Sequence, residues 1–264
     1  MADKGIAVLL YGFGAELGNF RFFADDAATE LVGLKKFAKA DIVVKQTLNR
    51  TSFVAALMDV PVGQKIKELH IFSHSIGGGL YVGYHEPTAT TVREAAARRY
   101  MATSSKITYT EVLNAEVGGI LADHLLRDPM KRDQMALRAK FAPDAFIKIW
   151  GCNSGVRGWI YTDIDSSTNT FVSAQNGTAD YYYWRALNTQ NTPKPSIAQA
   201  LADYFGVPVF GAGSGSHIEV QRKGEWITSN KYRQESGRWP SEPQTLRLHP
   251  DRGSYKRFNP SSAR

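Results

Sequence analysis

LHIFSHSIGGG at residues 69–79 and FIKIWGCNSG at residues 146–155 are the two stretches from which the fold of this chain can be inferred. Each starts as an apolar run and ends in a turn of small residues, the pattern of a buried strand followed by a loop. Further strand-like runs lie at 6–11, 41–45 and 207–210, and helical spacing of apolar residues occurs at 19–39, 53–58, 109–126, 129–140 and 196–205. This alternation predicts a three-layer αβα fold with a mostly parallel sheet of about five or six strands.

His74 follows the first of these stretches and Cys152 ends the strand of the second. Right-handed crossovers bring the carboxyl ends of parallel strands to one edge of a sheet, where ligands bind, so we expect the two side chains to face each other there. A cysteine thiol needs a basic neighbour to react near neutral pH, and histidine titrates in that range. We therefore predict a dyad in which Cys152 is the nucleophile and His74 the general base and acid. Backbone N–H groups near Ser75, Gly77 and Cys152 would form the oxyanion hole.

Three segments together carry a resemblance to a known family: SHSIGGGLYVGYHE, IKIWGCNSG and ALADYFGVPVFGA. Their order and flanking elements resemble the caspase-like cysteine peptidases (clan CD), in particular CHAT-type and related bacterial domains, over roughly residues 5–212. The resemblance implies a caspase-like α/β domain, here residues 1–236, that hydrolyses a peptide or protein substrate. Ser75 stands where that family has a glycine whose backbone N–H serves the oxyanion hole.

Residues 156–195 form a long polar and aromatic stretch directly after Cys152. A stretch of this length without the strand and helix pattern is typical of a functional insertion. We expect it to overhang the predicted site and to shape the substrate pocket. The side chains that we expect in that pocket are Trp159, Asp163, Tyr182 and Trp184.

The last part of the chain differs in composition from the rest. Residues 217–222 and 225–229 are typical of a hairpin that turns at Lys223-Gly224, and residues 237–264 are predicted to be an irregular tail. Residues 221–264 hold ten basic and four acidic side chains, which is nearly the whole net charge of +7. This distribution favours a solvated basic tail, or one that contacts an acidic partner, and nucleic acid is not expected as a partner.

Several classes of site and location are not expected from the composition. The single cysteine excludes a disulfide within the chain, and no His or acidic pair has the spacing of a metal site, so we expect no metal and no cofactor. No apolar run reaches the ~18 residues of a membrane span. The amino terminus has no signal-peptide pattern, which predicts a cytoplasmic protein or an effector exported without a cleaved signal.

An α/β-hydrolase is the main alternative enzyme. SHSIG at residues 73–77 is similar to the G-x-S-x-G elbow, with Ser75 as nucleophile, His217 as base and Asp163 or Asp165 as the residue that orients it. An elbow serine must begin a helix, whereas residues 76–84 contain four glycines and favour a hairpin.

Two further interpretations remain open. GFGAELG at residues 12–18 resembles a dinucleotide-binding turn, but the second strand run ends at Lys45-Gln46, where such a domain needs an acidic residue. The chain could also be a binding module that has the fold without the chemistry, in which case Cys152 is a structural thiol.

Overall fold

The structure is a computed structural model. It describes residues 4–12, 20–75, 79–82, 119–122, 125, 130–151, 154–155, 195–213, 216–237, 246–250 and 255–261.

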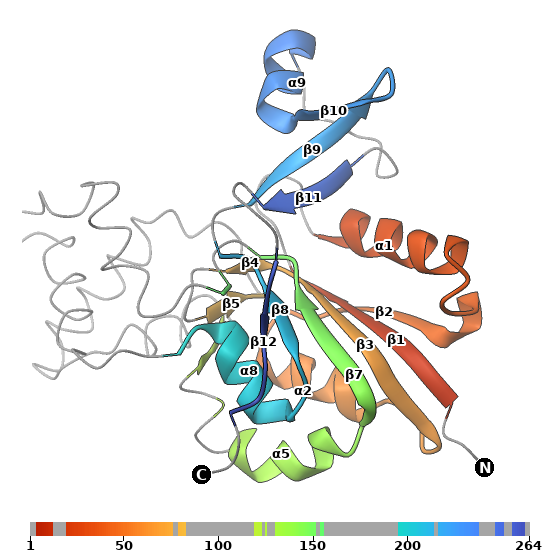
Figure 1. Ribbon diagram of the computed structural model, residues 1–264, viewed down its shortest axis with the longest axis vertical. Coiled ribbons are helices and arrows are strands. Elements are labelled where there is room, and N and C mark those ends of the chain that lie inside the picture. Colours follow the sequence, from red (N-terminus) through yellow and green to blue (C-terminus); the bar gives the residue numbers. More distant parts are fainter. Residues whose placement is uncertain are drawn as a thin grey trace, which may run out of the picture.

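A six-stranded sheet with the order β12-β8-β7-β3-β1-β2 forms the centre of the described part (Figure 1). Five of its strands are parallel, namely β1 (Lys4–Tyr11), β2 (Ile42–Gln46), β3 (Gln64–Phe72), β7 (Phe141–Ile149) and β8 (Val209–Gly211). They correspond to the five apolar runs of the sequence. The predicted α/β class with a mostly parallel sheet is therefore confirmed.

Both faces of this sheet are buried, and β1 shows how its sequence achieves this. Ile6, Val8 and Leu10 pack into one core cluster, whereas Ala7 and Leu9 pack into a second cluster on the opposite face. Successive side chains of a strand point to opposite faces, so a strand covered on both sides needs a continuous apolar run rather than an alternating one. The run GIAVLLY meets that need.

Helices on both faces supply the partners of these two clusters. The first cluster contains residues of α2 (Arg50–Met58), α5 (Met130–Arg138) and α8 (Ile197–Phe205), and the second contains residues of α1 (Arg21–Gly33), as Figure 1 shows. The ends of α8 follow local sequence rules. The Ser196 side chain caps its amino end by accepting a hydrogen bond from the Gln199 N–H, and Gly206 ends it at a φ of 73°.

The helix predicted at residues 109–126 is wrong over residues 119–121. These residues form β6 (Gly119–Leu121), which pairs antiparallel with β5 (Gly79–Tyr81), and β5 in turn pairs with β4 (His74–Ser75). Two consecutive glycines, Gly118 and Gly119, weaken a helix at this point, and β5 offers unpaired backbone groups to a third strand.

The prediction of an irregular tail at 237–264 is also wrong over two segments. β11 (Leu246–Pro250) pairs antiparallel with β9 (Ser216–Arg222), whose other neighbour is β10 (Glu225–Thr228). β12 (Lys256–Phe258) adds an antiparallel strand to the edge of the central sheet, beside β8. The alternation Leu246-Arg247-Leu248-His249 is typical of a strand with one buried face, but it is short and lies among Pro and Ser residues.

Two short elements complete the described part. They are the 3₁₀ turn η1 (Lys39–Asp41) and the helix α9 (Ser229–Ser236). Among the described helices, none has the length and apolar character needed to cross a membrane.

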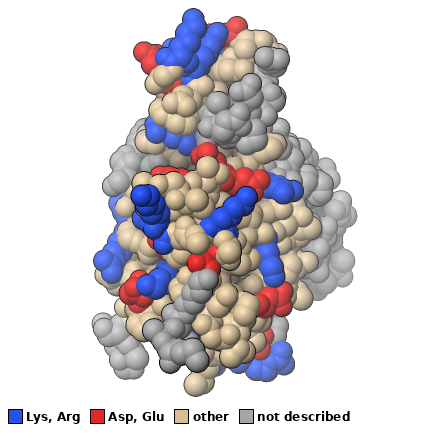
Figure 2. Space-filling view, turned by 90° about the vertical axis from the view of Figure 1, so that its right-hand side faces the viewer, with Lys and Arg blue, Asp and Glu red and all other residues tan. Residues whose placement is uncertain are grey.

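Among the described residues, charged side chains of both signs are mixed on the face shown in Figure 2, without one continuous basic patch. In the carboxyl-terminal part of the chain, Arg222 pairs with Glu235 and Arg247 pairs with Glu219. Two of the arginines in this part are thus paired locally with carboxylates.

A pair of leucines tests whether α8 belongs to the main core. Leu201 of α8 is 0% exposed. We expect Leu201→Ala to lower the free energy of unfolding by about 2–5 kcal/mol, because it removes buried methyl groups and leaves a cavity. Leu34, which is 58% exposed, is the matched control, and its replacement by Ala should change stability by no more than about 0.5 kcal/mol. Urea unfolding measures both variants, and equal effects would show that α8 does not pack as described.

Candidate functional site

The carboxyl ends of β3 and β7 lie side by side. The two strands are parallel neighbours with Ile71 opposite Ile149, and the Trp150 N–H donates to the Ile71 carbonyl at 2.8 Å. The chain leaves β3 at Ser73 and leaves β7 at Trp150, one residue before Gly151. The same edge of the sheet therefore carries His74 and the residue that precedes Cys152.

Gly151 is in close contact with the backbone on both sides of His74. A Cβ atom placed on Gly151 would lie 2.8 Å from the Ser73 carbonyl oxygen and 2.8 Å from the Ser75 Cβ. Only a residue without a side chain fits between these atoms, so glycine at position 151 has a packing reason.

His74 is partly buried against an aromatic ring. Its imidazole meets the Phe20 ring edge-to-face, with 5.0 Å between the ring centroids. Burial lowers the pKa of His74 to about 4. The imidazole is therefore neutral at physiological pH.

Ser75 begins no helix. His74 and Ser75 form β4, in which Ser75 pairs with Leu80 of β5. The Ser75 side chain is 2% exposed, and within the described part of the chain its hydroxyl has no hydrogen-bond partner. A nucleophile elbow needs an exposed serine at a strand-to-helix turn, so this geometry is unlike an elbow. His217 lies in β9 of a different sheet, where its Nε2 is 3.1 Å from Glu219 Oε1.

The sequence around Ser154 indicates only a residue of the turn after the strand, but the structure gives its side chain further contacts. Its hydroxyl donates to the Gly151 carbonyl and accepts from the Ala212 N–H, at 3.1 and 3.0 Å. Its carbonyl accepts from the Ala198 N–H at the start of α8. One buried serine thus connects the end of β7, the end of β8 and the first turn of α8.

Several of the residues predicted for the site lie outside the described residues. They are Cys152, Gly77, Trp159, Asp163, Asp165, Tyr182 and Trp184, together with the rest of the insertion at 156–194. The predictions about the pocket therefore remain predictions.

Gly12 does not offer space to a phosphate. Its N–H donates to the Phe72 carbonyl at 2.8 Å, and a Cβ on Gly12 would lie 2.6 Å from the Val82 carbonyl oxygen. A dinucleotide-binding turn uses its glycines for close approach of the pyrophosphate. Here the space at the first glycine is filled by the backbone of Val82.

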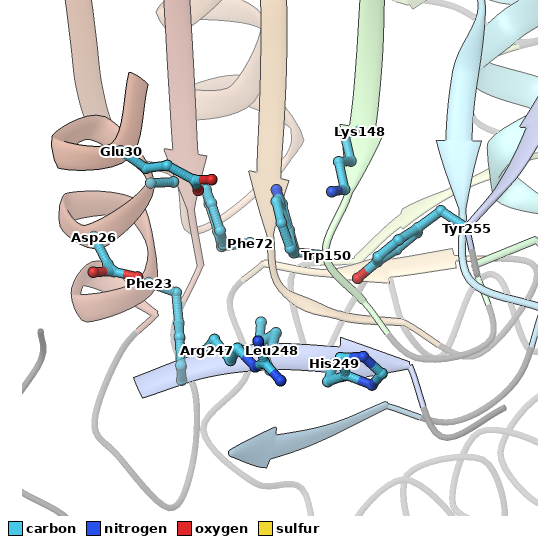
Figure 3. A pocket seen from close by; sticks show the side chains of 11 residues that line it. Phe23, Asp26, Glu30, Phe72, Lys148, Trp150, Arg247, Leu248, His249 and Tyr255 are labelled. Atoms are coloured by element: carbon cyan, nitrogen blue, oxygen red, sulfur yellow. The ribbon is translucent and has the colours of Figure 1, made fainter. Parts of the chain in front are cut away.

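A hollow lies near the same strand ends, between α1 and β11 (Figure 3). Its volume is about 340 Å³, and residues of α1, β7 and β11 line it. Lys148 Nζ lies 3.6 Å from the centre of the Trp150 ring and 4.6 Å from that of Tyr255. The sequence does not reveal this cavity because its walls come from segments far apart in the chain.

Burial shifts two charged groups in this cavity toward their neutral forms. It lowers the pKa of Lys148 to about 8, against the opposing influence of Glu30. It raises the pKa of Asp26 to about 6, and the nearby charge of Glu30 adds to that shift. The cavity therefore holds polar groups whose charge changes within two pH units of neutrality.

His70 is a core histidine with both ring nitrogens engaged, as its place inside a strand indicates. Trp150 Nε1–H donates to His70 Nδ1 at 3.1 Å, so Nε2 carries the hydrogen and faces Glu68 Oε2 at 3.0 Å. Burial lowers the pKa of His70, although the Glu68 carboxylate acts in the opposite direction. This chain of contacts holds the Trp150 ring at the wall of the cavity.

One group of side chains in the described part has the composition of a metal site. His217, Glu219 and His249 each offer a ligand atom, and these atoms lie within 4.8 Å of one another. The sequence spacing predicted no metal site. The sequence does contain one sign of this site, the pair His-x-Glu within a strand, because alternate residues of a strand point to the same face. The third residue comes from another strand, so the pair alone does not predict the site.

The comparisons with known proteins found no matching family model, no matching curated protein and no matching solved structure.

Two glycine variants test the contact between the strand ends. Gly151→Ala should lower the free energy of unfolding by about 1–3 kcal/mol, because its Cβ would overlap the Ser73 carbonyl oxygen and the Ser75 Cβ, and neither can move without the backbone. Gly33, the last residue of α1, is the control because a Cβ there has nothing within 4 Å. Gly33→Ala should be neutral or stabilising by up to about 1 kcal/mol. Chemical denaturation compares the two, and an unchanged Gly151→Ala would contradict the described contact.

Proposed function

We propose that this chain is a cysteine-dependent hydrolase of the caspase-like type that cleaves peptide bonds, with Cys152 as nucleophile and His74 as general base. The observation that carries the proposal is the contact of Gly151 with Ser73 and Ser75, on either side of His74. Cys152 follows Gly151 by one peptide bond, so their Cα atoms are about 3.8 Å apart. Covalent geometry thus ties the only thiol of the chain to the residue that contacts the chain on both sides of His74.

The local structure around His74 supports the same proposal. The chain continues from His74 into an antiparallel strand pair, β4 and β5, and the caspase-like resemblance implies a small hairpin at this place. The Ser75 N–H, with Gly77 and Cys152, is proposed to bind the oxyanion. In this proposal the serine hydroxyl takes no part in the chemistry, and alanine at position 75 would keep the N–H.

The proposed mechanism starts from a neutral His74 imidazole. Its imidazole takes the proton of the Cys152 thiol while the sulfur attacks the carbonyl carbon of the substrate. The protonated imidazole then gives this proton to the leaving amine as the C–N bond breaks, which leaves a thioester on Cys152. Water, deprotonated by the same imidazole, hydrolyses the thioester, and the thiol recovers its proton.

Three variants and a fluorogenic peptide library test the proposed nucleophile. Cys152→Ala should lower kcat by several orders of magnitude, on the order of the 10⁶-fold seen for loss of a nucleophile. Ser75→Ala should change it only mildly. Ser73→Ala is the matched control, because it removes a second buried hydroxyl beside His74 that likewise has no hydrogen-bond partner among the described residues.

Two results would overturn the proposal. Full hydrolysis by Cys152→Ala, with loss in Ser75→Ala, would show a serine enzyme. If the folded wild-type protein cleaves no library member and iodoacetamide modifies Cys152 only in denaturant, the thiol is structural and the chain is a binding module.

The acid limb of the pH profile is a separate prediction. Because burial lowers the pKa of His74 to about 4, the imidazole stays a proton acceptor well below its ordinary value of 6.5. The acid limb of kcat/KM, which reports the free enzyme, should therefore lie near pH 4. An acid limb near pH 6.5 in a folded protein would contradict it.

Folding must be followed in the same experiment. His74 in the unfolded chain takes up a proton at a higher pH than in the folded chain, so its contribution to stability is complete above about pH 6.5 and declines as the pH falls toward 4. Circular dichroism at each pH separates loss of the fold from protonation of the base.

A further inference from the structure

We propose that His217, Glu219 and His249 bind a divalent transition metal, with zinc as the expected ion. This site is independent of Cys152 and His74. It belongs to the three-stranded sheet β10-β9-β11, which lies against α1 and not among the parallel strands.

The pairing of β9 with β11 assembles the three side chains. His217 lies directly opposite His249 in the antiparallel register, with their ring centroids 5.7 Å apart. Glu219 is two residues after His217 and so lies on the same face of β9. Both imidazoles and the carboxylate therefore face one small region of space.

The ligand atoms are near the spacing that a tetrahedral metal requires. Zn–N and Zn–O bonds of about 2.1 Å put tetrahedral ligand atoms about 3.4 Å apart. His217 Nε2 and Glu219 Oε1 are already 3.1 Å apart, and all three ligand atoms lie within 4.8 Å of one another. Small side-chain rotations suffice to close the site, and the metal ion would replace the hydrogen shared by Nε2 and Oε1.

Arg247 orients the Glu219 carboxylate for metal binding. Its Nε donates to Glu219 Oε2 at 2.7 Å, which leaves Oε1 turned toward His217. The guanidinium is itself held 4.2 Å from the centre of the Trp226 ring. The carboxylate is thus held in a fixed orientation by a second residue, as metal ligands usually are.

The donor set selects the class of metal. Two imidazole nitrogens and one carboxylate oxygen suit zinc and its transition-metal neighbours, whereas magnesium and calcium prefer oxygen ligands throughout. Three protein ligands leave one tetrahedral position for water or for another molecule. His249 also lies at the wall of the cavity of about 340 Å³ that holds Lys148 and Trp150 (Figure 3).

Metal titration of the full chain, freed of metal by a chelator, tests the proposal. We expect calorimetry to give one Zn²⁺ per chain, zinc to raise the melting temperature, and Co²⁺ to give the visible absorption of a tetrahedral site. His217→Ala and His249→Ala should each weaken binding by more than about 100-fold. Arg247→Ala, which removes only a partner of a ligand, should weaken it by roughly 10- to 100-fold.

Matched controls make the result specific. Glu219→Gln removes the ligand charge with little change of shape, whereas Glu235→Gln changes another arginine-paired glutamate of the same region and should leave binding unchanged. Cys152→Ala should bind zinc as the wild type does, which separates this site from the proposed nucleophile. The proposal is overturned if the folded wild type takes up no zinc or cobalt at micromolar concentration, or if the double variant His217→Ala/His249→Ala binds as tightly as the wild type.

Discussion

The parallel pairing of β3 with β7 is the constraint on which the rest of the described structure depends. Its register sets Ile71 against Ile149 and ends both strands at the same level, so that His74 leaves the sheet beside Gly151. The two segments are far apart in sequence, and only their backbone hydrogen bonds and their shared apolar faces bring them together. Ser154 then anchors the turn beyond β7 to β8 and α8, which limits how far the strand end can move.

The same pairing distributes the side chains of these strands between two environments. Ile147 and Ile149 enter the large core beneath α2, α5 and α8, whereas Lys148 and Trp150 point toward α1 and β11. A lysine at this place loses hydration, and its ammonium group compensates in part by lying over the rings of Trp150 and Tyr255. His74, at the edge of the sheet, is therefore only a few residues along the strands from the residues that line the polar, aromatic cavity.

The carboxyl-terminal strands extend this arrangement. β11 joins β9 to complete a small sheet whose Leu248 packs against the α1 cluster, and β12 covers the edge of the central sheet beside β8. A parallel sheet with an open edge exposes unpaired backbone groups, so the last strand protects an edge as well as adding apolar contact through Phe258. The three side chains of the proposed metal site come together only because β11 returns to β9.

The sequence by itself determined the parallel strands, the ends of α8 and the placement of His74 at a strand end, because these depend on local apolar runs, capping residues and turn residues. It also favoured a strand over a helix after Ser75, because the glycines there are poor helix formers. Only the tertiary structure decided that residues 119–121 pair as a strand, that 246–250 and 256–258 join two different sheets, and that His249 meets His217. The physical reason is that these short segments lack a local preference strong enough to select their conformation, so partners distant in the chain select it for them.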